Sequence, residues 1–359
     1  MKNNKIHIIL TILLPIQVIL VQLAGNHSNI IEKYYSMWLY PLISSLFRVL
    51  FGSIPFSVGD IVIGFLLLIL FRFLFKLIIT RFKNFRNIFL NLTAFLSVIY
   101  FFFYLFWGLN YYREPLAKNL GYTKTSHTNK ELLKTTNYVL KKLNFYQLEI
   151  TDNDSLMVEN KVSREKIYEM AFEGLRNLEK DYPQLEYKYS SVKSSLISTF
   201  QSYNGTSGYF NPFTGEAQVN NLIPKNGYPT TTYHEIAHQI GYAAEDEANF
   251  IGFLASNNHD DIYFKYASYR MAFIYLIKEV KKRDQHAFNK IWEDLNIGVI
   301  KDFNKSNAFW KSYKNPFEPI IKKGYDIYLK ANNQPRGIKS YNYVVNLLIS
   351  YFNIKFSLN

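Results

Sequence analysis

The sequence predicts an α+β membrane protein, in which an N-terminal bundle of three transmembrane helices precedes a mostly helical domain with a small antiparallel sheet. Three apolar stretches in residues 1–112 approach the roughly 20 residues that a spanning helix needs. From residue 113 to residue 359 the charges are mixed, and no apolar run is long enough to cross a bilayer. We therefore expect a membrane region, 1–112, followed by one further domain, 113–359.

The predicted spans cover about residues 6–25, 58–79 and 88–110. The first follows Lys2 and Lys5 and resembles a secretory signal peptide, but it lacks a small-residue cleavage site and two more spans follow it, which favours a retained helix. Behind the third span, Trp107, Tyr111 and Tyr112 are typical of an aromatic belt at the membrane interface.

The segment between the first two spans is apolar but is interrupted by Pro41, Arg48 and Gly52. This pattern favours an interfacial amphipathic helix over about residues 36–51, lying on the outer membrane surface. A fourth span is the alternative, and it would move the C-terminal half of the chain to the other side of the membrane.

Basic residues predict the orientation. Lys2 and Lys5 precede the first span, and Arg81, Lys83 and Arg86 lie in the link between the second and third spans. The positive-inside rule places both groups in the cytoplasm, so three crossings leave the C-terminal domain outside the cytoplasmic (inner) membrane, in the periplasm. Because topology accounts for much of the formal charge of +13, we expect the lipid bilayer as a partner and no nucleic acid.

The second half of the chain begins with helical patterns. Residues 129–143 and 163–182 carry helical apolar spacing, and the second of these starts at a serine that can cap it. Residues 190–198 alternate like a strand, and residues 208–220 read as a hairpin that turns at residues 211–215.

The most informative stretch is HEIAHQIGYAAEDEANFIGFLA, residues 234–255. On a helix, His234 and His238 are one turn apart and project from the same face. Two neutral imidazoles at this spacing can reach one Zn²⁺ at about 2.0–2.1 Å. Glu235 would then act as general base toward the zinc-bound water. Two such histidines can also be structural, but the flanking acidic residues favour the metal site.

The ends of this helix are also predicted from the sequence. Thr230, Thr231 and Thr232 follow Pro229 and can cap its start. Gly241 is expected to end it in a left-handed conformation, and a second helix would run from about residue 244 to residue 255.

A catalytic zinc needs a third protein ligand, which a carboxylate can supply. We expect Glu245, because it begins a stripe of small residues that lets the second helix approach the first; Glu247 is the alternative. The stripe contains Ala248, Asn249, Gly252 and Ala255, whereas Glu247 heads the bulky stripe of Phe250, Ile251 and Leu254. Asn249 would hydrogen-bond the free ring nitrogen of a ligand histidine.

The stretch resembles the gluzincin branch of zinc metallopeptidases, in which HExxH is followed by a glutamate and, four residues later, by an aspartate or asparagine. Glu245, Ala248, Asn249 and Gly252 match one version of this second motif. The gap after His238 is shorter than in most gluzincins and is closer to the turn of metzincins. A metzincin's third histidine would fall at Ala244, however, which excludes a metzincin site.

The whole chain also resembles an uncharacterised family of bacterial three-span membrane proteins with a zincin-like C-terminal domain. Zincins hold substrate as an added strand against a sheet edge, and the resemblance implies that residues 208–220 provide it. The oxyanion of the tetrahedral intermediate needs a donor, for which Tyr209, Tyr228 and Tyr269 are candidates, with Arg270 as a further one.

These observations predict a membrane-anchored zinc metallopeptidase that hydrolyses peptides or envelope proteins, with Zn²⁺ as its cofactor. The alternative is a non-catalytic envelope sensor or assembly protein that keeps a structural metal. Intramembrane proteolysis is a third possibility, but the polar neighbours of the motif and its distance from Tyr112 disfavour it.

Overall fold

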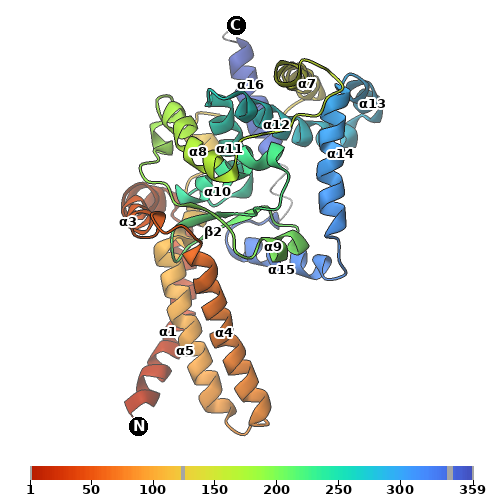
Figure 1. The fold of residues 1–359 in the computed structure, drawn as a ribbon. Helices are drawn as coiled ribbons and strands as arrows, with labels where there is room; N and C mark the ends of the chain where they lie inside the picture. Colours follow the sequence, from red (N-terminus) through yellow and green to blue (C-terminus); the bar gives the residue numbers. More distant parts are fainter. Residues whose placement is uncertain (1, 123–125, 338–342, 358–359) are drawn as a thin grey trace.

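The computed structural model describes residues 2–122, 126–337 and 343–357. Figure 1 shows a bundle of long helices, the stalk, below a larger and mostly helical domain. The stalk consists of α1 (Lys2–Gly25), α4 (Val58–Ile79) and α5 (Phe85–Phe106). Among the described residues, these three helices are long and apolar enough to cross a membrane, which confirms the three predicted spans.

The third span is shifted relative to the prediction. It starts at Phe85 and ends at Phe106, because the chain bends at Trp107 and enters a 3-10 turn. Trp107, Tyr111 and Tyr112 are buried there with Tyr40 and Ala243. The prediction that these three residues form an aromatic belt at the membrane interface is therefore wrong, because their rings are buried against the domain.

Between and after the spans the chain forms many shorter helices. They are α2 (Ser28–Ile30), the π-helix η1 (Ile31–Leu39), α3 (Tyr40–Gly52), the 3-10 helix η2 (Gly108–Tyr112), α6 (Leu116–Asn119), α7 (Asn129–Thr151), α8 (Arg164–Glu179), the 3-10 helix η3 (Pro183–Leu185), α9 (Ser198–Asn204), the 3-10 helix η4 (Lys225–Gly227), α10 (Tyr228–Gln239), α11 (Glu245–Asn258), α12 (Ile262–Arg283), α13 (Gln285–Glu293), α14 (Ile297–Ser312), α15 (Glu318–Ala331) and α16 (Val344–Ser357).

Several predicted helices are confirmed. Helix α7 is longer than predicted, and α8 begins as expected, with the Ser163 side chain accepting a hydrogen bond from the backbone N–H of Lys166. The amphipathic segment at 36–51 is helical in η1 and α3. One face of α3 is buried against the domain through Tyr40, Ser44 and Arg48, while its other face is exposed.

The sheet has three strands, β1 (Val192–Ser194), β2 (Gly208–Asn211) and β3 (Glu216–Val219), in the order β1-β3-β2. The predicted hairpin is confirmed, since β2 and β3 pair antiparallel. The prediction of an antiparallel sheet is wrong in one respect, because β1 runs parallel to β3. The strand predicted at residues 190–198 is also shorter: beyond it, the backbone N–H of Leu196 donates to the carboxylate of Asp60 instead.

The core of the domain surrounds α10 and α11, which pack against each other. Helices α8, α12 and α16 cover α11, and strands β2 and β3 lie against α10. The central side chains Tyr233, Ile236, Phe250 and Phe253 are fully buried. The motif predicted from the sequence is therefore at the centre of the fold.

The C-terminal end of α10 is held by side chains from the membrane-proximal segments. The last carbonyl groups of a helix have no partner within the helix and need donors from elsewhere. Trp107 Nε1 donates to the His238 carbonyl at 2.9 Å, and Tyr40 Oη and Ser44 Oγ donate to the Gln239 carbonyl at 2.7 and 2.8 Å. These bonds join the segments beside the stalk to the helix that carries the histidines.

We predict that Tyr40→Phe lowers the free energy of unfolding by about 1 kcal/mol, because it removes a buried hydrogen bond to α10 while keeping the ring. The measurement is thermal unfolding of the full chain in detergent. Tyr34→Phe is the matched control, since Tyr34 is 58% exposed, and it should change stability by less than about 0.5 kcal/mol. Equal effects of the two substitutions would contradict the role assigned to Tyr40.

Candidate metal centre

Helix α10 begins earlier than predicted. Its N-cap is Gly227, and Pro229 lies in its first turn, where a proline is tolerated because its missing N–H would have no partner there. Thr230 and Thr231 are therefore inside the helix, and their hydroxyls donate to the Gly227 carbonyl at 3.0 and 3.1 Å. The prediction that these threonines cap the helix is wrong.

The end of α10 is as predicted. Gly241 has a φ of +92°, a left-handed conformation that glycine adopts without strain. The N–H of Tyr242 donates back to the Ala237 carbonyl at 3.0 Å across this glycine, as in a Schellman ending. The chain then reverses, and α11 starts at Glu245.

Helices α10 and α11 approach closely at Gly252. A Cβ atom at this position would lie 2.9 Å from the Thr230 carbonyl oxygen and 3.4 Å from the His234 nitrogen. The small stripe that begins at Glu245 therefore faces α10, as the sequence predicted. This packing carries Glu245 up to the two histidines.

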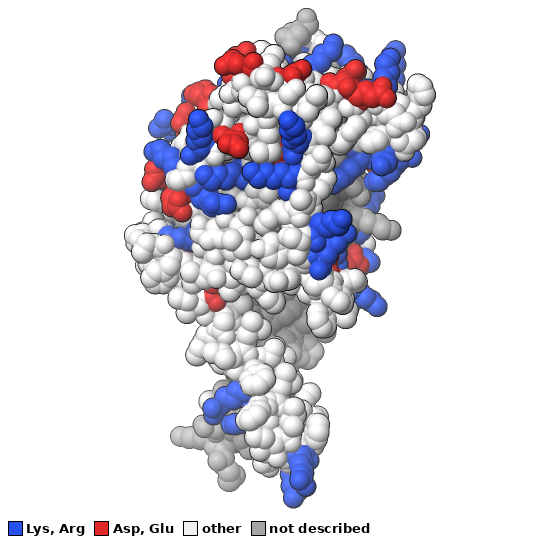
Figure 2. All heavy atoms as spheres, turned by 45° about the vertical axis from the view of Figure 1, so that its right-hand side comes forward, with Lys and Arg blue, Asp and Glu red and all other residues white. Residues whose placement is uncertain are grey.

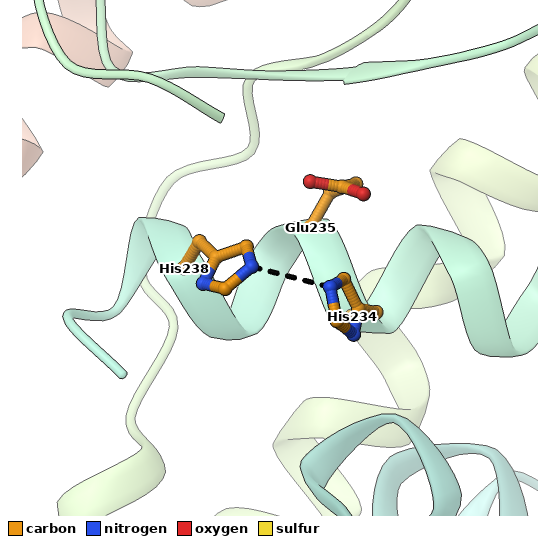
Figure 3. A group of neighbouring side chains, drawn as sticks. All are labelled: His234, Glu235 and His238. Atoms are coloured by element: carbon orange, nitrogen blue, oxygen red, sulfur yellow. Dashed lines mark hydrogen bonds between the residues drawn. The ribbon is translucent and has the colours of Figure 1, made fainter. Parts of the chain in front are cut away.

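Three ligand atoms converge between these helices. Figure 3 shows His234 and His238 on one face of α10, with their Nε2 atoms 3.2 Å apart. Glu245 Oε2 lies 3.3 Å from Nε2 of His234 and 3.8 Å from Nε2 of His238. Three atoms at these separations can all lie about 2.0–2.1 Å from one common point, which is the usual bond length between zinc and nitrogen or oxygen ligands.

The other ring nitrogens are fixed by oxygen acceptors. His234 Nδ1 lies 3.1 Å from Asn249 Oδ1, and His238 Nδ1 lies 2.7 Å from the Tyr242 carbonyl oxygen. The predicted contact between the Asn249 side chain and a ring nitrogen of His234 is thus present. With the proton of each neutral ring on Nδ1, both Nε2 lone pairs face the same point. Two lone pairs and a carboxylate repel one another unless a positive charge lies between them.

The carboxylate of Glu245 fits a metal ligand. It is only 4% exposed, and within the described part of the chain its Oε2 accepts no hydrogen bond. The hydroxyl of Tyr325 donates to the other oxygen and so orients the group. An unsatisfied buried oxygen aimed at two imidazole nitrogens is the arrangement that a divalent metal ion would complete.

Glu235 occupies a different side of α10. It is buried and points toward the neighbouring strand in Figure 3. A Cβ atom on Gly208 of β2 would lie 2.5 Å from its Oε1, so this glycine leaves room for the carboxylate. Glu235 also lies within 4.8 Å of the ligand nitrogens of His234 and His238, close enough to act on a molecule bound there.

Burial and neighbouring charges set the protonation states. Burial raises the pKa of Glu235 to about 8 and lowers the pKa of His238 to about 4, so His238 is neutral, as a metal ligand must be. Burial opposes the charge on Glu245, but its interactions with His234 and His238 prevail and lower its pKa to about 2. The pKa of His234 is raised, since Glu245 and Glu235 outweigh the effect of burial.

Glu247, the alternative third ligand, faces elsewhere. Its Oε1 accepts the backbone N–H of Leu116 at 2.6 Å. Burial raises its pKa to about 8, and the charge of Asp246 adds to this effect. Only Glu245 of the two is directed at the histidines.

The predicted oxyanion donors are not brought together at the site. Tyr228 is fully buried and its hydroxyl pairs with that of Tyr168. Tyr269 is buried and stacks on Tyr146; neither Tyr228 nor Tyr269 lines the cavity described below. Tyr209 does line it, but its hydroxyl donates to Asp60.

Arg270 is the remaining predicted donor, and it also lines the cavity. Its guanidinium is held by Asp302 through Nε at 2.7 Å and by the hydroxyl of Ser306. Its charge is thus largely paired inside the domain.

A cavity of about 1110 Å³ contains the site and is lined by residues that the sequence did not link to the histidines. They come from distant parts of the chain: Phe103, Trp107, Tyr111, Tyr275, Tyr325 and Tyr328. The hydroxyls of Tyr111 and Tyr328 lie 3.2 Å apart. No sequence signal linked α15 to the histidines.

Comparison with known protein families gives one match. The family described as Protein of unknown function (DUF3810) matches residues 35–349, which include the whole site. No curated protein and no solved structure matches the chain.

Two glycines inside helices test the packing of the site. Gly252→Ala should lower the free energy of unfolding by about 1–3 kcal/mol, because the new methyl meets the backbone of α10. Gly324→Ala should raise it by about 0.5–1 kcal/mol, since Gly324 lies inside α15 with no atom within 4 Å of a Cβ there. Both are measured by thermal unfolding of the full chain, and stabilisation by Gly252→Ala would contradict the close approach.

Proposed function

The chain belongs to the DUF3810 family, and from its site we propose that it is a membrane-anchored zinc-dependent peptidase. The observation that carries the proposal is the convergence of His234 Nε2, His238 Nε2 and Glu245 Oε2 on one point. Two imidazoles and a carboxylate, with no cysteine in the chain, are a ligand set typical of catalytic zinc sites.

The chemistry is hydrolysis of a peptide bond. When bound, Zn²⁺ supplies a Lewis acid that polarises a carbonyl group and lowers the pKa of water. His234, His238 and Glu245 would hold the ion, and Asn249 keeps the ring of His234 oriented. Glu235 accepts a proton from the attacking water and passes it to the leaving amine.

The environment of Glu235 suits this role. Its pKa of about 8 reflects burial, and a divalent cation beside it would favour the charged form and so lower that pKa. A general base works best with a pKa near the working pH. Gly208 leaves the space in which the carboxylate lies.

The substrate is held by strand addition. Strand β2 lies at one edge of the three-stranded sheet, and its residues Gly208, Tyr209 and Phe210 line the cavity. An extended peptide that pairs with this edge would pass directly over Glu235. A cavity of about 1110 Å³ has room for several residues of such a peptide.

We assign the oxyanion donor to Tyr275 rather than to the tyrosines predicted from the sequence. Tyr275 lines the cavity, and its hydroxyl makes no hydrogen bond to the described residues. Burial, and after it the charge of Glu245, raises the pKa of Tyr275, and the contribution of Glu245 indicates that the hydroxyl lies near the ligands. A neutral hydroxyl there can donate to developing negative charge.

The proposed location is the cytoplasmic membrane, with the domain on the periplasmic side. Figure 2 shows Lys and Arg side chains at the end of the stalk that points away from the domain. Arg81 and Lys83 lie in the link between α4 and α5. The positive-inside rule assigns this end to the cytoplasm. Envelope proteins and peptides are then the accessible substrates.

Glu235→Gln should retain one zinc ion per chain and lower peptide hydrolysis by about 10²–10⁴-fold, because the proton acceptor is lost while the ligands stay. The full chain in detergent is assayed with a peptide library and by metal analysis. Cleavage by this variant at the rate of the wild type would contradict the mechanism. If the wild-type protein binds the metal but cleaves no peptide, the protein would instead be a metal-binding sensor or assembly protein.

The third ligand is tested by a matched pair. Glu245→Gln should weaken zinc binding by more than the roughly 10–100-fold that the loss of an outer hydrogen-bond partner typically costs. Glu247→Gln should leave zinc binding unchanged, because its amide oxygen can still accept the Leu116 N–H. Zinc titration with a competing chelator measures both, and the opposite order of effects would assign the ligand to Glu247.

A further inference from the structure

Exposed apolar side chains gather on three elements of the domain: α3, α9 and α15. Such patches on a folded domain mark a contact with another apolar surface. Figure 1 shows all three elements at the side of the domain from which the stalk emerges. The three elements are far apart in the sequence, so it is the fold that brings them to the same side of the domain.

Helix α15 has two apolar faces. Its inner side lines the cavity through Ile321, Tyr325 and Tyr328. Its outer side carries a second apolar stripe, with Ile320 70% exposed and Ile327 59% exposed; the two lie two turns apart on one face. This outer stripe has no protein partner among the described residues.

The outer stripe of α15 is bordered by positive charge. Lys323 and Lys330 are exposed beside it, where long stems can follow an apolar surface and leave the charge in water. Asp326 pairs with Lys330, and Glu318 pairs with Lys322. Apolar side chains flanked by lysines are typical of helices that lie in a membrane interface.

The other two elements carry matching stripes. In and just before α9, Leu196 and Phe200 are 59% and 62% exposed. On α3, Leu42 and Leu46 are exposed on the face opposite Tyr40 and Ser44, which bind α10. Each stripe therefore faces away from the domain.

Hydrogen bonds to the spans fix the depth of these elements. The Asp60 carboxylate, in the first turn of α4, accepts the backbone N–H of Leu196 at 2.7 Å, immediately before α9. The hydroxyl of Tyr104, in the last turn of α5, donates to Asn332 Oδ1 at 2.7 Å, immediately after α15. Both α9 and α15 are thus tied to the ends of membrane-spanning helices.

Helix α3 is tied to the same level by the chain itself. It ends at Gly52, six residues before α4 begins at Val58. Figure 2 shows that most of this face is uncharged from the upper stalk to the lower part of the domain, apart from charged side chains near its right-hand edge, whereas Lys, Arg, Asp and Glu are dense above it. On this face, the uncharged surface of the stalk therefore continues onto the domain.

We propose that α3, α9 and α15 form a collar that lies in the interfacial layer of the bilayer, with the outer stripes among the lipids. The partner is the membrane surface that surrounds the spans, and its apolar contact is the same hydrophobic burial that anchors other interfacial helices. The collar stands independently of the proposed hydrolysis.

The collar brings the cavity to the membrane surface. The cavity is lined by Phe103 of α5, by Asn204 at the end of α9 and residues 205–207 after it, and by the inner side of α15. Its lower wall is therefore made by the same elements that contact lipid. A polypeptide that reaches the site would meet it beside the bilayer.

The chain contains no cysteine, so single cysteines can report the depth of each position. Ile320→Cys on α15 and Phe200→Cys on α9 test the collar, and Gln285→Cys on the exposed start of α13 is the control. Each is labelled with nitrobenzoxadiazole and reconstituted as the full chain in vesicles of phosphatidylcholine and phosphatidylglycerol. Quenching by spin-labelled lipid and by aqueous iodide is then compared.

At Ile320 and Phe200 we expect blue-shifted emission, strong quenching by spin-labelled lipid and protection from iodide. At Gln285 we expect the reverse. Iodide quenching at Ile320 and Phe200 equal to that at Gln285, without quenching by the lipid, would overturn the collar. Circular dichroism of each labelled variant confirms that the chain is folded, and the readout does not depend on any enzymatic activity.

Discussion

The hydrogen bonds that hold the end of α10 determine the geometry of the site. Trp107 and Tyr40, from segments beside the stalk, donate to the last carbonyl groups of this helix, and the helix ends at His238 and Gln239. Gly241 then reverses the chain so that Glu245 returns to the two histidines. The membrane region is therefore part of the structure that forms the site.

Local pattern in the sequence was sufficient to predict which side chains of α10 and α11 lie together. Residues that share a face of a helix can be identified from the period of 3.6 residues per turn alone. This is true of His234 and His238 on α10 and of the stripe of small residues that begins at Glu245 on α11. The structure places Glu245 rather than Glu247 at the histidines for the same reason. The spans were equally accessible, because length and hydropathy define them.

Long-range contacts were not accessible from the sequence. Nothing in the sequence around Trp107 indicates that its ring lies under α10, and an interfacial tryptophan has the same local pattern. Tyr325 donates to Glu245 across 80 positions of the sequence. Strand β1 pairs with β3 in parallel, and just beyond it the Leu196 N–H donates to Asp60 of the stalk. In each case the partner is decided by packing between distant elements, which periodicity does not report.

The central claim is that the two imidazoles and the Glu245 carboxylate bind one metal ion. X-ray absorption spectroscopy at the zinc edge of the full chain, loaded with one equivalent of Zn²⁺, tests this directly. The account predicts two imidazole nitrogens and further oxygen ligands at about 2.0–2.1 Å. A spectrum without imidazole scattering, or zinc that the folded protein fails to retain at one ion per chain, would contradict it.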